Sequence, residues 1–277
     1  MAHPSNGVRL LLRSCALLAV LTTPLHAEEE FSYLFEIPTR LSPDASGELG
    51  DYIQATLDIA NTDDAVALIE SEGAIDIIAV DGSQITVLVA AQATTVPVYD
   101  ENDLAQSFVI DYDEDSVMTT TSLLRDSFGA SPAPGAIEQF VYEYIDDKNY
   151  LSGFDFASKV ARTRAGDCTE HAVLMAALSR AEQYPARVVL GILLEITGDE
   201  VSGYGHAWTE LFHNGRWQLY DATVPADLES DAQYYYLPMM SLNNEGPGYG
   251  MELLRLSVVE PTLISGIQAA QAPNLSP

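Results

Sequence analysis

The dipeptide Asn214-Gly215 constrains the fold of this chain more than any other feature. It separates two runs with strand character, residues 205–213 and 216–223. Asn-Gly is typical of a two-residue turn between antiparallel strands, because both of its residues tolerate a positive φ. If the turn contains only these two residues, His213 faces Arg216 and all other pairs across the hairpin follow. The sequence therefore predicts both a hairpin and its register.

The predicted register brings two polar side chains of the hairpin close together. His206 lies opposite Thr223, and Trp208 lies opposite Asp221. Side chains two residues apart share a face, so His206 and Asp221 are diagonal neighbours with β-carbons within about 8 Å. A carboxylate there can accept a hydrogen bond from the imidazole and fix its tautomer. The simpler alternatives are a histidine satisfied within the core and an aspartate that caps the following turn.

A third reactive side chain, Cys168, stands at the start of a predicted helix that runs to about residue 183. Asp167 and Glu170 form a variant of the capping box, and Tyr184-Pro185 ends the helix. The free N–H groups of the first turn and the positive end of the helix dipole favour a thiolate and can hold an oxyanion. The alternative is a small, buried hydrophobic residue.

Cys168, His206 and Asp221 together match a catalytic triad of nucleophile, base and orienting acid, carried in order by a helix and two strands. Two other interpretations remain. A zinc ion could bind Cys168, His171 and His206, although a structural zinc site requires four ligands and no clear fourth ligand is present. A binding module without catalysis could also have kept the fold. We expect no cofactor and no metal.

The segments around these residues resemble the transglutaminase-like superfamily, especially its bacterial secreted members. The resemblance implies an α+β, papain-related fold in which the helix that carries Cys168 packs on an antiparallel sheet. It implies Cys168 as nucleophile, His206 as general base and Asp221 as the partner that orients it. The implied chemistry is acyl transfer from an amide, by transglutamination or by hydrolysis as a protease or isopeptidase. The matching segments are 166–172, 185–191, 206–208, Trp217 and 221–223, within about 136–225.

Two positions depart from the usual pattern of this superfamily. Gln183-Tyr184-Pro185 stands where Gly-Ile/Val-Pro is common, and Ala222 follows the aspartate where proline is usual. Neither position belongs to the predicted triad.

The charge of the chain restricts its partners. It has 12 Lys and Arg against 41 Asp and Glu among 277 residues, a formal net charge of −29. This field repels phosphate backbones and anionic lipids, so we expect no nucleic-acid partner. The expected partner is a protein or peptide substrate. Only two cysteines, Cys15 and Cys168, are present, which excludes a disulfide scaffold and a four-thiolate zinc site.

The first 27 residues have the pattern of a signal peptide. Arg9 and Arg13 flank and interrupt an apolar run at 10–21, which is too short to span a bilayer, and Ala27 precedes an acidic stretch. Cleavage after Ala27 would leave Cys168 as the only cysteine. We therefore expect a periplasmic or secreted protein without stable membrane insertion, and an uncleaved membrane anchor is the alternative.

The rest of the chain divides at a cluster of Ser, Pro and Gly at 131–135. We expect a mainly-β region of unknown role at 28–130, a catalytic domain at 131–267 and a flexible tail at 268–277. The expected helices are 63–72, one that contains the apolar stripe 137–145, and 154–162. An acidic stretch at 111–115 is interpreted as a solvated turn. The expected strands, besides those of the hairpin, are 31–37, 53–59, 75–80, 84–89, 187–196, 234–236 and 253–259.

Overall fold

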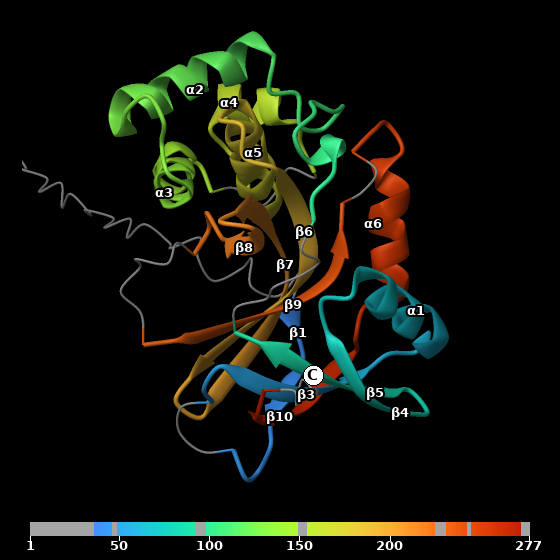
Figure 1. Cartoon of the computed structure of the whole chain (residues 1–277). Coiled ribbons are helices and arrows are strands. Elements are labelled where there is room, and N and C mark those ends of the chain that lie inside the picture. Colours follow the sequence, from blue (N-terminus) through green and yellow to red (C-terminus); the bar gives the residue numbers. More distant parts are fainter. Residues whose placement is uncertain are drawn as a thin grey trace, which may run out of the picture.

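The computed structural model describes residues 36–45, 49–91, 98–148, 154–224, 231–242 and 245–272. These residues form two five-stranded sheets and a group of helices (Figure 1). The predicted signal peptide and most of the predicted strand 31–37 lie outside the described residues. Within the described part, no helix combines the length and the apolar character needed to cross a membrane.

The first sheet is antiparallel throughout and is built around the predicted hairpin. Its strand order is β1-β7-β6-β9, with β8 paired to the free side of β7. His213 faces Arg216, and Asn214 and Gly215 have φ values of 53° and 78°. The two-residue turn and its register are therefore confirmed. The strands are β1 (Glu36–Ile37), β6 (Ala186–Thr197), β7 (Glu200–His213), β8 (Arg216–Tyr220) and β9 (Gln233–Ser241).

Four helices gather at one end of this sheet, with the cysteine helix at their centre (Figure 1). All residues of α5 from Glu170 to Arg180 are buried, which explains its Ala- and Leu-rich sequence. The Thr209 hydroxyl of β7 donates a 2.9 Å hydrogen bond to the Ala172 carbonyl of α5. The predicted α+β fold, with this helix on an antiparallel sheet, is confirmed. The helices are α2 (Asp115–Phe128), α3 (Pro134–Tyr144), α4 (Ala157–Thr163) and α5 (Cys168–Ala181).

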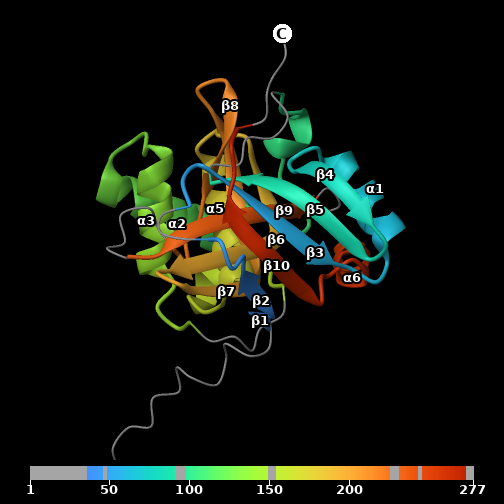
Figure 2. The same cartoon turned by 90° about the horizontal axis from the view of Figure 1, so that it is seen from below.

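The second sheet lies at the other end of the molecule and is seen face-on in Figure 2, with strand order β2-β10-β3-β5-β4. Its pairs are antiparallel except for β10 with β2. The predicted helix 63–72 and the hairpin that follows it are confirmed, and Gly73 ends the helix in the left-handed conformation. The elements are β2 (Thr39–Leu41), β3 (Tyr52–Asp58), α1 (Thr62–Glu72), β4 (Asp76–Asp81), β5 (Gln84–Ala90) and β10 (Leu263–Ala269), and a 3₁₀ turn η1 (Glu101–Asp103) follows this hairpin.

The prediction of a mainly-β region up to residue 130 is wrong in its last part. Asp115, at the end of the predicted acidic turn, begins α2, whose buried residues are Val117, Thr120, Thr121 and Leu124. This spacing is helical, but threonine disfavours helices because its hydroxyl competes for backbone groups. In α2 the hydroxyls of Thr120 and Thr121 donate to carbonyls four residues earlier, which satisfies them within the helix.

The predicted strand at 253–259 is also wrong, since Tyr249–Val258 forms the helix α6. Its Leu and Val content resembles that of a strand, and a short apolar run does not distinguish the two structures. The strand that follows, β10, pairs with β3 and β2 of the second sheet. It runs to Ala269, so the first two residues of the predicted flexible tail are ordered. The predicted boundary at 131 therefore does not separate the two sheets.

Candidate functional site

A reciprocal cap begins α5 and places Cys168 in its first turn. The Asp167 carboxylate accepts hydrogen bonds from the first-turn backbone, including one of 2.9 Å from Thr169 N. The Glu170 carboxylate accepts in return from Asp167 N at 3.0 Å, as the capping box predicts. Burial, followed by the bond and the charge of Asp167, raises the pKa of Glu170 to about 7.

The glycine before the cap is required by the shape of this turn. Gly166 has a φ of 152°, and a β-carbon there would collide with the Glu170 side chain. The backbone N–H of Cys168 has no hydrogen-bond partner among the residues that the structure describes. It is therefore free to hold a negatively charged oxygen next to the sulfur.

His206 lies on β7 between the residues that pair with β1 and those that pair with β8. β1 pairs with β7 at Gly203 and Tyr204, and β8 pairs with it from Thr209 to His213. The His206 side chain is 9% exposed, and its ring lies 6.3 Å from that of Trp208 at an interplanar angle of 24°. This packing limits the rotation of the imidazole.

Asp221 follows β8 directly and contacts His206 as the register predicts. The Nε2 atom of His206 and Oδ2 of Asp221 are 2.7 Å apart. The Asp221 side chain is buried, so its charge must be met by hydrogen bonds. Tyr236 donates its hydroxyl to Oδ2 at 2.9 Å, and Thr223 donates both its backbone N–H and its hydroxyl to Oδ1.

The charges of His206 and Asp221 stabilise each other. Burial disfavours the imidazolium, but the charges of Asp221 and Cys168 and the hydrogen bond to Asp221 outweigh it and raise the pKa of His206 to about 10. Burial likewise disfavours the carboxylate, but the charge of His206 and the hydrogen bonds from His206 and Thr223 lower the pKa of Asp221 to about 2. The pair is therefore an imidazolium and a carboxylate at neutral pH.

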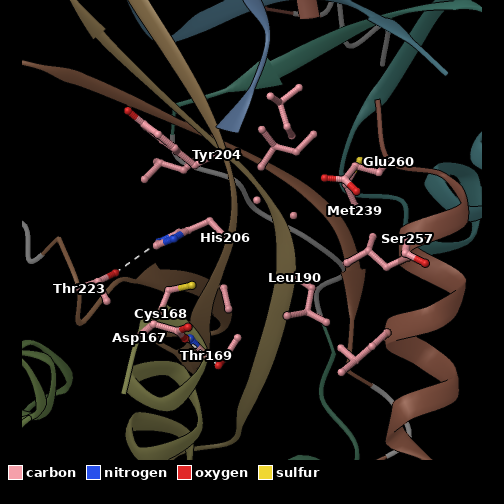
Figure 3. Close-up of a pocket in the computed structure, with 18 of the residues that line it drawn as sticks. Asp167, Cys168, Thr169, Leu190, Tyr204, His206, Thr223, Met239, Ser257 and Glu260 are labelled. Carbon is pink, nitrogen blue, oxygen red and sulfur yellow. Dashed lines mark hydrogen bonds between the residues drawn. The ribbon is translucent and has the colours of Figure 1, made fainter. Parts of the chain in front are cut away.

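Cys168 and His206 lie side by side on one wall of a cavity (Figure 3). With Asp221 behind the imidazole, all three residues of the predicted triad meet at one place. Nε2 of His206 contacts Asp221, so Nδ1 is the ring nitrogen that remains for the cysteine. The arrangement can transfer a proton between a thiol and an imidazole whose orientation is fixed.

His171 was considered above as a zinc ligand, but in the structure it contacts the backbone at the start of its own helix. Its Nδ1 lies 2.6 Å from the Asp167 carbonyl oxygen, so Nδ1 carries the proton. Its Nε2 is buried without a hydrogen-bond partner in the described part of the chain. Burial is the main cause that lowers the pKa of His171 to about 4, so this ring is neutral at pH 7. Within the described residues, no group of three His, Cys, Asp or Glu side chains is placed to hold a metal ion.

Sequence reasoning missed three residues that surround Asp221. Thr223 carried a local signal, because a threonine two residues after an aspartate commonly donates to its carboxylate. Tyr236 lies on β9, and the sequence predicted only that it belongs to a strand at 234–236. Glu138 of α3 accepts a 2.8 Å hydrogen bond from the Asp221 backbone N–H. No sequence signal connects Glu138 with Asp221, because they are far apart in the chain.

The cavity has a volume of about 500 Å³ and is lined by Cys168. β6, β7 and β9 form much of its wall, and α6 and the residues after it form the opposite side, where Figure 3 labels Ser257 and Glu260. Most side chains on this wall are apolar. Its volume is that of a typical ligand site, and Cys168 and His206 lie at its polar end.

Comparison with known proteins agrees with the predicted resemblance. Residues 128–222 match the model of the transglutaminase-like superfamily, and this range contains all three residues of the predicted triad. The resemblance is therefore confirmed over these residues, and it supports a family of cysteine-dependent enzymes. No curated protein matches the chain.

Two similar solved structures come from bacteria. A candidate cysteine protease from Cytophaga hutchinsonii is 17% identical with a TM-score of 0.41, and the match covers 68% of this chain and 76% of that one. The periplasmic domain of TgpA from Pseudomonas aeruginosa is 21% identical with a TM-score of 0.37, over 51% of this chain and 54% of that one. Both scores are below 0.5, so the resemblance rests on the superfamily match.

Proposed function

We propose that this protein is an exported cysteine-dependent enzyme that transfers the acyl group of a peptide or side-chain amide. Cys168 is the nucleophile, His206 the general base and Asp221 the residue that orients His206. The observation that carries the proposal is the 2.7 Å contact between His206 Nε2 and Asp221 Oδ2, beside Cys168 on the wall of an open cavity.

The first half of the reaction acylates the cysteine. Because His206 is an imidazolium at neutral pH, it already holds the proton of Cys168, and the Cys168 thiolate attacks, so that Sγ forms a bond to the amide carbonyl carbon. The carbonyl oxygen then carries the negative charge, which the free Cys168 N–H at the start of α5 can stabilise. When the carbon–nitrogen bond breaks, the imidazolium returns the proton to the leaving amine. The product is a thioester on Cys168.

The second half releases the acyl group. His206 takes a proton from water or from a primary amine, which attacks the thioester, and the Cys168 thiolate leaves. Water gives a carboxylic acid, as in a protease or isopeptidase, and an amine gives a new amide, as in a transglutaminase. The resemblance to bacterial members of the superfamily favours hydrolysis.

Export is part of the proposal and rests on the sequence of residues 1–27. The apolar run flanked by Arg9 and Arg13 should direct secretion, and cleavage after Ala27 should produce a mature chain that begins at Glu28. N-terminal sequencing of the protein recovered from the producing cells tests this directly. A chain that begins at Met1 in the membrane fraction would contradict it.

Activity profiling with a peptide library, with and without primary amines, tests the chemistry. Mass spectrometry should find cleaved peptides or amine conjugates, and Cys168→Ala and His206→Ala should each abolish both. His213→Gln is the matched control for His206, because His213 lies on the same strand but at the hairpin end. It should retain activity.

Thiol labelling and zinc analysis separate the two alternative interpretations. A folded protein whose thiol reacts with iodoacetamide but which converts no peptide would favour a binding module. Stoichiometric zinc in the purified protein that disappears in Cys168→Ala and His171→Ala would favour the metal site.

A further inference from the structure

The cavity beside Cys168 has an apolar interior whose composition is informative about the substrate. Much of its wall consists of buried side chains, and two polar residues across from the triad, Ser257 and Glu260, are exposed. A polar substrate group placed in the interior would lose its hydrogen bonds to water without gaining new ones. The buried apolar residues of the wall include Ile37, Leu190, Ile192, Leu193, Met239 and Val259.

The helix α6 closes the side of the cavity that faces the triad. Leu253 and Leu256 line the cavity, while Leu254 lies on the outer side of the helix and is 56% exposed. No residue of α6 is buried, although Leu253 and Leu256 face inward. Both leucines are half-buried and pack against the core, and the part of their surface that lines the cavity borders open space. A ligand that fills this space would complete the burial of two leucines.

We infer that the substrate carries a bulky apolar side chain at, or one residue from, the carbonyl that Cys168 attacks, and that this side chain lies between β6, β9 and α6. The inference rests on the proposed function, because it takes Cys168 as the point of attack. The reacting carbonyl must lie at the polar end of the cavity, so the neighbouring part of the substrate reaches the apolar wall (Figure 3). Leucine, phenylalanine and methionine side chains fit a cavity of about 500 Å³. Alanine and glycine leave the cavity unfilled, and glutamine places a polar amide in it.

Two matched measurements test this inference. The first is the rate at which Cys168 is alkylated by peptidyl acyloxymethyl ketones that differ in one side chain, divided by the rate with iodoacetamide. The second is the affinity of the corresponding peptide amides for the Cys168→Ala variant, measured by fluorescence anisotropy. Peptides that carry leucine, phenylalanine or methionine should show relative alkylation rates and affinities at least tenfold higher than peptides that carry alanine or glutamine. Each buried methylene group contributes to this discrimination.

The leucines of α6 provide the controls. Leu253→Asp and Leu256→Asp each place a charge on the cavity wall, and each should reduce the preference for apolar side chains to less than threefold. Leu254→Asp introduces the same charge on the exposed side of the same helix and should keep the preference. Circular dichroism verifies that all three variants retain the helix content of the wild type.

The outcomes distinguish this inference from the proposed function. Equal affinities of the apolar and polar peptides for Cys168→Ala would overturn the inference, even if the wild type hydrolyses peptides. A preference that Leu254→Asp loses as readily as Leu256→Asp would also overturn it. A clear preference in binding, together with a Cys168 that reacts with no probe, would support the apolar site and contradict the catalytic role of Cys168.

Discussion

At the scale of single residues, the burial of Asp221 determines how the site works. A carboxylate that is 2% exposed stays ionised only because its neighbours donate to it. These donors also fix its position, and Asp221 in turn fixes the tautomer and the orientation of His206. Replacement of Asp221 by alanine should therefore slow turnover severely without removing the nucleophile.

The pair Tyr236 and Tyr235 allows a controlled test of this support. Tyr236→Phe removes one donor from Asp221, so we expect kcat to fall about tenfold with little change in KM, because the tyrosine acts through Asp221. Tyr235 is the adjacent residue, and its hydroxyl donates to the Gly50 carbonyl at 2.6 Å instead. Tyr235→Phe should cost similar stability, about 1 kcal/mol, but leave kcat unchanged. Equal loss of kcat in both variants would show that Tyr236 has only a structural role.

His171 makes the folded protein sensitive to acid. Its pKa is about 4 in the folded protein, whereas an unfolded chain has the ordinary value of 6.5. Between these values the unfolded chain binds a proton that the folded protein does not, so the stability present above pH 6.5 is lost as the pH falls. The expected loss of unfolding free energy is about 3 kcal/mol between pH 6.5 and 4, and His171→Phe should abolish this contribution.

Comparison of the wild type with His171→Phe separates the titration of His171 from that of the other groups. Glu170, with its pKa of about 7, acts in the opposite direction over this range because the folded protein then binds the proton. Urea denaturation at several pH values should show a smaller loss of unfolding free energy on acidification for His171→Phe than for the wild type. Parallel curves would mean that His171 is protonated in the folded state.

At the scale of elements, the turn Asn214-Gly215 sets the register that brings His206 to Asp221. Gly215 has a φ of 78°, a conformation that strains any residue with a β-carbon. Gly215→Ala should lower the free energy of unfolding by about 1 kcal/mol and reduce activity as the hairpin adjusts. Gly135 in α3 has open space around it and no positive φ, so Gly135→Ala should cost nothing. Equal stability of the two variants in urea denaturation would contradict the role of the turn.

At the scale of the whole molecule, the excess of acidic residues should make stability depend on salt. With 41 acidic and 12 basic residues, repulsion within the folded protein is extensive, and salt screens it with a Debye length of about 8 Å at 0.15 M. The melting temperature should rise between low salt and 0.15 M sodium chloride. A flat or falling curve would mean that local ion pairs compensate the acids. The same charge predicts that the protein does not bind nucleic acid.

The sequence alone predicted the elements that depend on short-range chemistry. The capping box at Asp167 and Glu170 and the turn at Asn214-Gly215 each involve residues within a few positions of one another. Their hydrogen bonds and φ preferences are therefore local, and the contact between His206 and Asp221 follows from the turn by counting.

Only the tertiary structure decided the contacts between distant segments. α6 and β10 were not predicted, because the conformation of a short apolar run depends on the surface that it covers. Glu138 and Tyr236 reach Asp221 from α3 and β9, and the apolar cavity exists only where α6 faces β6 and β9. These arrangements depend on burial and on pairing across long stretches of chain, which no local pattern records. The sequence thus determined which side chains can react, and the packing decided what supports them and what they can bind.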